Sequence, residues 1–115
     1  MEDNECKITY GDKVRKVINH YGVMKQLKYM QTEVFELNEA IINHELKKTV
    51  EYEIPLTELV GSKEHIEEEM ADVLLMLDQF IAYYNLDFDK ISEIMEYKMN
   101  RQLERIANEQ EGNNW

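Results

Sequence analysis

Residues that interrupt helices are scarce in this chain, and their scarcity limits its fold more than any other feature. The 115 residues include only 4 Gly and 1 Pro, whereas a β fold of many short strands needs frequent turn residues. Apolar residues recur at alternating steps of three and four, which is the spacing of one helical face. The sequence therefore predicts an all-α protein with a single domain over residues 1–115, because a chain of this length builds one core.

Four segments carry this helical pattern. Gly22 is expected to end the first helix, and Ser62 is expected to cap the start of the third. Connections between the helices are short, which favours antiparallel neighbours and hence a four-helix bundle-like fold. The predicted helices span about residues 12–21, 23–46, 62–84 and 87–108.

The segment from Val50 to Gly61 has a different pattern. Apolar and acidic residues alternate from Val50 to Ile54, and Pro55 is expected to end any helix. We therefore expect an extended loop or a short hairpin between the second and third helices. The two ends of the chain, residues 1–9 and 109–115, are expected to be loosely ordered.

Charge and cysteine content narrow the class of protein. The 24 Asp and Glu residues outnumber the 13 Lys and Arg residues, which leaves a net charge of −11. Such a balance repels nucleic acid and attracts cations. The single cysteine, Cys6, cannot form an intramolecular disulfide and suits a reducing compartment. No secretory signal and no membrane-spanning apolar run are recognisable, so we expect a cytoplasmic protein without nucleic-acid or membrane partners.

Two pairs of acids lie on the two central helices. Glu33 and Glu36 on one helix, and Glu69 and Asp72 on the next, are each three residues apart and share a helix face. At about 100° per residue, each pair lies on the same-sense flank of its apolar stripe, so antiparallel packing brings all four acids to one edge. A hard divalent cation such as Mg²⁺ would relieve their repulsion. Ala40 and Asn43 continue this flank with small or polar side chains that leave space for a ligand.

The charged patterns also have simpler interpretations. A solvated acidic face shows the same spacing, since Glu64 and Glu67 form another such pair. On the fourth helix, Lys98, Arg101 and Arg105 recur at steps of three and four, which could serve phosphate binding. The same cations could instead complement the helix dipole and pair with nearby acids.

The ordered set of motifs resembles that of the MazG-type all-α nucleotide pyrophosphohydrolases. That family carries Glu-x-x-Glu on one helix, Glu-x-x-Asp on the next and Lys-x-x-Arg on a further helix. The corresponding segments here are QTEVFELNEAI, EEEMADVLLML and YKMNRQLERI, and HYGVMKQLKYMQTEV resembles the approach to the first motif. The likeness covers about Asp12 to Ile106. Thr32 stands where many members have a further acid, and the stretch between the two acidic motifs is long for the family.

This resemblance implies a MazG-type fold and hydrolysis of NTPs or dNTPs between the α- and β-phosphates, which releases a monophosphate and pyrophosphate. It also implies a homodimer or homotetramer and a requirement for Mg²⁺, with Mn²⁺ as a substitute. Carried over by position, the metal ligands are Glu33, Glu36, Glu69 and Asp72, with Glu36 also a candidate to activate water. The catalytic set is then Glu36, Lys98 and Arg101, and Lys98 and Arg101 would also bind the substrate phosphates. The substrate-binding prediction adds Arg105 from the cationic spacing and Gln26 from its proximity to the first acidic motif.

Other functions use some of the same features. A di-iron carboxylate bundle normally needs Glu-x-x-His, but no His here follows a Glu by three residues. A non-catalytic acidic interaction protein, either a nucleic-acid mimic or a regulatory scaffold, also fits the net charge. The preferred nucleotide stays open, and the candidates for base recognition are His20, Tyr21, Gln26, Tyr29 and Asn43.

Overall fold

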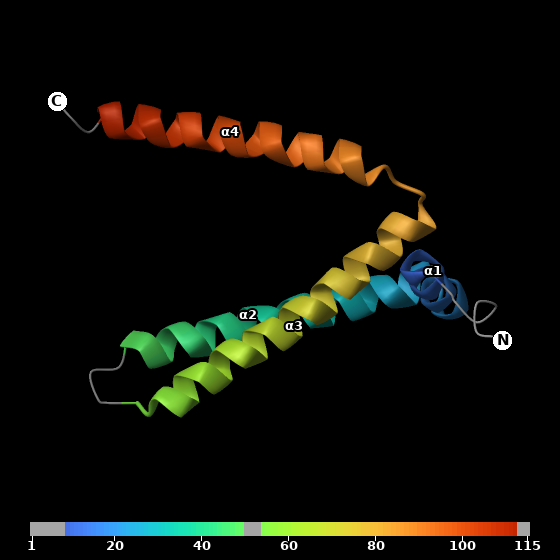
Figure 1. The fold of residues 1–115 in the computed structure, drawn as a ribbon, viewed down its shortest axis with the longest axis horizontal. Helices are drawn as coiled ribbons and strands as arrows, with labels where there is room; N and C mark the ends of the chain where they lie inside the picture. Colours follow the sequence, from blue (N-terminus) through green and yellow to red (C-terminus); the bar gives the residue numbers. More distant parts are fainter. Residues whose placement is uncertain (1–8, 50–53, 113–115) are drawn as a thin grey trace. The chain divides into compact units, whose positions relative to one another are not determined.

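The computed structural model of the protein describes residues 9–49 and 54–112. Within them lie four α-helices and no strand, so the all-α prediction is confirmed. None of these described helices combines the length and the apolarity needed to cross a bilayer. The helices are α1 (Tyr10–Tyr21), α2 (Val23–Thr49), α3 (Leu56–Tyr83) and α4 (Phe88–Gly112), as Figure 1 shows. The chain divides into two compact units, Met1–Tyr84 and Asn85–Trp115. The single domain stays a prediction.

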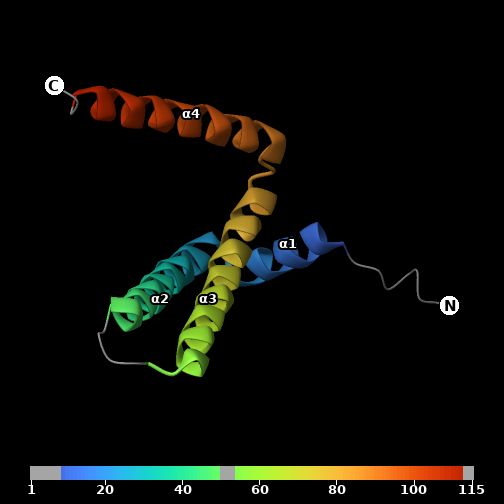
Figure 2. The ribbon, with the colours of Figure 1, turned by 60° about the vertical axis from the view of Figure 1, so that its left-hand side comes forward.

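The first unit consists of α1, α2 and α3. Figures 1 and 2 show α2 and α3 side by side and running in opposite directions, with α1 packed near the start of α2. This arrangement is the antiparallel pairing that the short connections predict. The buried apolar side chains are Val14, Ile18, Ala40, Val73 and Met76. Ala40 is only 2% exposed, so its small side chain packs in the core and does not open space for a ligand as the sequence predicted.

The ends of α1 follow from local chemistry. Thr9 accepts a hydrogen bond from the Asp12 backbone N–H at 3.1 Å, and this cap starts the helix at Tyr10, slightly before the predicted position. Gly22 ends the helix, as predicted, with a φ of 91°. Its N–H donates to the Ile18 carbonyl at 2.8 Å, and its φ favours a residue without a Cβ.

The prediction for the segment before Ser62 is wrong over residues 56–61. The helix α3 begins at Leu56, directly after Pro55. A proline at a helix start loses no hydrogen bond, because the first N–H groups have no intrahelical partner. Glu58 in the first turn also suits the positive end of the helix dipole. Residues 50–53, the first part of the predicted extended segment, lie outside the described residues.

Ser62 therefore lies inside α3 and is not its cap. Its hydroxyl donates to the Leu59 carbonyl at 2.9 Å and lies 2.7 Å from Nδ1 of His44 on α2. Because the hydroxyl proton is used on Leu59, His44 Nδ1 is the donor in the second contact. Lys47 and Glu58 form an ion pair at 3.6 Å between the same two helices. These contacts join the start of α3 to the end of α2.

The second unit contains α4. Asp87 Oδ1 accepts hydrogen bonds from the backbone N–H groups of Asp89 at 3.0 Å and Lys90 at 3.3 Å, which fixes the start of the helix. The helix continues to Gly112, so residues 109–112 are helical where a loose end was expected. No residue of α4 is buried. A single helix cannot bury its own apolar side, so α4 needs a partner surface.

Candidate functional site

Three of the predicted acids converge between α2 and α3. Glu33 and Glu36 lie one turn apart on α2, and Glu69 faces them from α3. One carboxylate oxygen of each residue lies within 4.8 Å of the other two. The antiparallel pairing of the two helices produces this convergence, because it places the two acidic flanks on the same edge.

Two oxygens of this cluster are buried without a partner. Among the described residues, neither Glu33 Oε2 nor Glu69 Oε2 forms a hydrogen bond. Leaving an ionised oxygen buried and unpaired is costly. Hard oxygen donors that lack partners are the ligands Mg²⁺ prefers, so the donor set fits this ion. By contrast, the other pair, Glu64 and Glu67, is exposed to solvent.

The pKa of Glu33 also favours a bound cation at this cluster. Burial raises the pKa of the Glu33 carboxyl above its usual value, and the negative charges of Asp72, Glu36 and Glu69 raise it further. A hydrogen bond between the Glu33 and Asp72 carboxyl groups adds to the rise. The ionised form of Glu33 is therefore disfavoured in the folded chain. A bound divalent cation would supply both the positive charge and the missing partners of the buried oxygens.

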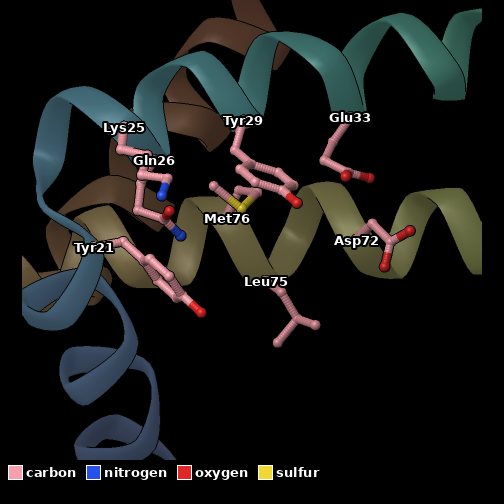
Figure 3. A pocket seen from close by; sticks show the side chains of 8 residues that line it. All are labelled: Tyr21, Lys25, Gln26, Tyr29, Glu33, Asp72, Leu75 and Met76. Carbon is pink, nitrogen blue, oxygen red and sulfur yellow. The ribbon is translucent and has the colours of Figure 1, made fainter.

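Asp72, the fourth predicted ligand, lies outside the group of three. Its side chain is exposed, and together with Glu33 it borders a pocket of about 410 Å³. Figure 3 shows Glu33 on α2 and Asp72 on α3 at the same end of this pocket.

The pocket lies between α2 and α3 and is large enough for a small molecule. Its lining includes two aromatic rings, two apolar side chains, a carboxamide and an ammonium group. Of the residues predicted from sequence for base recognition, Tyr21, Gln26 and Tyr29 line it, whereas His20 and Asn43 do not. The complete lining is Tyr21, Lys25, Gln26, Tyr29, Glu33, Asp72, Leu75 and Met76.

Sequence reasoning missed the lysines beside the acids. Lys25 Nζ lies 5.1 Å from the centre of the Tyr21 ring, a cation–π contact at the rim of the pocket. Lys25 and Lys28 also border a second hollow of about 420 Å³ on the other side of Glu33. The sequence could have predicted that Lys25 lies near Glu33, because Lys25, Tyr29 and Glu33 follow one another at steps of four on one helix face.

A histidine next to the cluster was also missed. His65 Nε2 lies 3.8 Å from Glu69 Oε1, and His65 Nδ1 lies 3.5 Å from Glu68 Oε1. The spacing of three and four residues within α3 places these side chains together. His65 therefore stands at the edge of the acidic cluster that faces away from the pocket lining.

The predicted basic residues lie on α4, in the second unit. Lys98, Arg101 and Arg105 share one face of that helix, and all are exposed. Arg101 lies over the Tyr97 ring at 5.8 Å, and Arg105 donates to Gln102 Oε1 at 3.4 Å. Their use in binding phosphate stays a prediction.

No family model, curated protein or solved structure matches this chain significantly. The resemblance to the MazG-type enzymes therefore continues to rest on the motifs themselves.

Proposed function

We propose that this chain is a cytoplasmic, Mg²⁺-dependent pyrophosphohydrolase that cleaves NTPs or dNTPs between the α- and β-phosphates. The observation that carries the proposal is the cluster of Glu33, Glu36 and Glu69, whose oxygens lie within 4.8 Å of one another. Two of its oxygens are buried without partners, which a solvated acidic face does not require. A pocket of small-molecule size adjoins the cluster, and the motif order resembles that of such enzymes.

In this proposal each acid has a role. Glu33, Glu36 and Glu69 would hold Mg²⁺, with Asp72 as a fourth ligand toward the pocket. When bound, Mg²⁺ would offset the charge of the phosphates and acidify the attacking water. Glu36, the most exposed acid of the three, would accept the water proton. The water oxygen would bond to the α-phosphorus while the bond to the bridging oxygen breaks, and pyrophosphate would leave.

Cationic side chains would stabilise the phosphates. The resemblance assigns this role to Lys98 and Arg101, with Arg105 one turn further along α4. Lys25 and Lys28 offer two further ammonium groups beside Glu33. Positive groups next to developing negative charge favour the transition state over the ground state only where their positions are fixed in advance.

We also propose a homodimer or homotetramer. In the described residues only five apolar side chains are buried, which is a small core for a chain of this length. Many large apolar side chains on α2 and α3 are exposed instead. Examples are Val34, Phe35, Ile42, Leu74 and Leu77. A second copy of the chain would cover such a surface.

The direct test is incubation with each common NTP and dNTP in Mg²⁺, followed by chromatographic separation of the products. We expect monophosphate and pyrophosphate from the wild type, and a loss of at least about a hundredfold in rate from the Glu36→Gln, Asp72→Asn variant. The matched control is Glu64→Gln, Glu67→Gln, which also removes two negative charges, but from exposed positions of α3. This variant should stay active.

The non-catalytic alternatives are outcomes of the same test. A folded wild type that binds Mg²⁺ but cleaves no nucleotide would indicate a regulatory scaffold. A protein that neither cleaves nucleotides nor binds Mg²⁺ at a defined site would indicate an acidic interaction protein, such as a nucleic-acid mimic. Either result would reject the enzyme.

A further inference from the structure

Two carboxamides are buried together between α2 and α3. Gln26 is 5% exposed and Gln79 is 6% exposed, and Gln26 Nε2 donates a hydrogen bond to Gln79 Oε1 at 2.8 Å. Gln79 Nε2 in turn reaches the Met76 sulfur at 3.7 Å, a weak acceptor. Two apolar side chains of similar size would fill this space without the desolvation cost of amide groups. Stability alone therefore gives no reason for polar residues here.

Only one amide of the Gln26–Gln79 pair borders the pocket. Gln26 lines the pocket and Gln79 does not. One of the two N–H groups of the Gln26 amide is used on Gln79, while Gln26 Oε1 forms no hydrogen bond with any of the described residues. If the Gln26 amide turned over, its oxygen would face the Gln79 oxygen. Turning both amides together would keep their hydrogen bond but would lose the contact of Gln79 Nε2 with the Met76 sulfur. With Gln79 in the observed orientation, the Gln26 carbonyl is available as an acceptor.

The surroundings of Gln26 suit a flat ring. Figure 3 shows Gln26 extending from α2 toward α3, with Tyr21 beside it and Tyr29 one turn further along α2. Leu75 and Met76 supply apolar contact from α3. Aromatic and apolar walls with one fixed polar group bind planar heterocycles and select among them by hydrogen bonding. Glu33 and Asp72 lie at the opposite end of the pocket, where charged groups of the same ligand would lie.

We propose that Gln79 is a positioning residue that sets nucleotide selectivity by orienting Gln26, so that the pocket prefers a base with an N–H donor facing Gln26 Oε1. This inference rests on the proposed function, since it takes the ligand to be a nucleotide. Gln79 acts only through Gln26 and does not touch the base. A base that lacks the donor would remove water from Gln26 Oε1 without replacing the hydrogen bond.

The test compares pairs of bases in which one member lacks this donor, either by removal of an amino group or by N-methylation. The pairs are uracil with 3-methyluracil, cytosine with 2-pyrimidinone, adenine with unsubstituted purine, and hypoxanthine with 1-methylhypoxanthine. Each pair is measured as triphosphates for kcat/KM and as monophosphates for affinity by calorimetry, which does not require turnover. The proteins are the wild type, Gln79→Glu, Gln79→Met and Gln26→Met, with folding checked by circular dichroism.

Each variant has a distinct expected result. The wild type should prefer the donor-bearing member of its best pair by about tenfold to a hundredfold. Gln79→Glu should keep this preference, because a carboxylate still accepts from Gln26 Nε2. Gln79→Met removes the acceptor and lets the amide turn, so the two affinities should come within about threefold of each other. Gln26→Met should remove the preference as well.

The outcomes separate this inference from the proposed function. A purely structural role of Gln79 would weaken both members of a pair equally, and an unchanged ratio in Gln79→Met would overturn the inference. Turnover by the wild type without any preference would overturn the inference and leave the proposed function intact. Selective binding without turnover would overturn the proposed function and leave the inference intact. If no nucleotide binds to the wild type, both are overturned.

Discussion

Glu33 combines burial, repulsion and a missing partner in one side chain. Its Oε2 is buried without a hydrogen bond among the described residues, and its pKa is raised by burial and by three neighbouring negative charges. In the absence of a cation this carboxylate opposes folding. In the presence of a cation, Glu33 should become a ligand. A substitution of Glu33 should therefore raise the stability of the protein without the cation and lower it, relative to the wild type, with the cation.

We predict that Glu33→Gln unfolds at a higher temperature than the wild type in EDTA, by the equivalent of about 1 kcal/mol. In Mg²⁺ the order should reverse, because only the wild type gains stability by binding the ion. Thermal unfolding in both buffers, at matched ionic strength, measures the effect. Glu64→Gln, an exposed acid on α3, is the control and should behave as the wild type. Equal stabilisation of Glu33→Gln and wild type by Mg²⁺ would contradict the assignment.

Tyr10 ties the start of α1 to α3. Its hydroxyl donates to Asp78 Oδ2 at 2.6 Å, and this hydrogen bond raises the pKa of Tyr10, with burial and the charge of Asp78 adding to the rise. A raised pKa in the folded state means that the contribution to stability is complete below the usual value of about 10. It is then lost as the pH rises through the raised pKa.

The Tyr10→Phe variant tests this contact. We expect it to be less stable than the wild type at neutral pH, by less than about 1 kcal/mol because the pair is partly exposed. The difference in unfolding free energy should stay constant up to about pH 9 and shrink above about pH 10. Urea unfolding over a pH series measures it. A difference of the same size at neutral and alkaline pH would show that the hydrogen bond is not its source.

At the scale of the elements, the helices show which local signals are reliable. The ranges of α1 and α2 were predictable because a cap and a long apolar period agreed with each other. The start of α3 was not, because Pro55 and Gly61 look like helix breakers in the sequence. In the structure Pro55 stands at the N-terminal boundary, where it does no harm. Contacts between α3 and α2, such as that of Ser62 with His44, then stabilise the first turns of α3. The helix propensity of these residues alone would stabilise them only weakly.

Two glycines provide a matched test of these helix ends. Gly61 lies within α3 with open space around its Cα, whereas Gly22 has a φ of 91°. We predict that Gly61→Ala stabilises the protein by about 0.5–1 kcal/mol through helix propensity. Gly22→Ala should destabilise it by about 1–2 kcal/mol through backbone strain. Urea unfolding of both variants decides the point, and a destabilising Gly61→Ala would contradict the helical start at Leu56.

The acidic cluster was predictable from sequence, but the pocket beside it was only partly so. The rotation of Glu33, Glu36 and Glu69 about their helix axes is readable from spacing alone. The burial of Gln79 and the position of Asp72 depend on how closely α2 and α3 pack. The residue pattern of one helix does not determine this packing. Gln26 was expected at the site from its proximity to the first acidic motif, whereas its partner Gln79 carries no signal in the sequence.

For the whole molecule, the main physical problem is the small amount of buried apolar surface. Within the second unit, α4 carries apolar side chains such as Met95 and Met99, and a single helix cannot cover such side chains by itself. We therefore predict that light scattering finds a mass of two or four chains at micromolar concentration. A monomer over the whole concentration range would contradict this prediction.

A charge placed on the apolar side of α4 tests the same idea at one position. Met99→Glu should lower the stability of the assembly by at least about 2 kcal/mol, because it removes apolar contact and buries a charge. Gln102→Glu adds the same charge to a polar position of the same helix and should have little effect. Equal behaviour of the two variants in thermal unfolding would show that this side of α4 stays in water.

The most direct test of the proposed metal centre is calorimetric titration of the protein with Mg²⁺, repeated with Mn²⁺. We predict saturable binding in the wild type and in Glu64→Gln, Glu67→Gln, and its loss in Glu36→Gln, Asp72→Asn. Weak, unsaturable binding that is equal in all three proteins would contradict the site, because it would show that the acids of α2 and α3 act only as a diffuse charged surface.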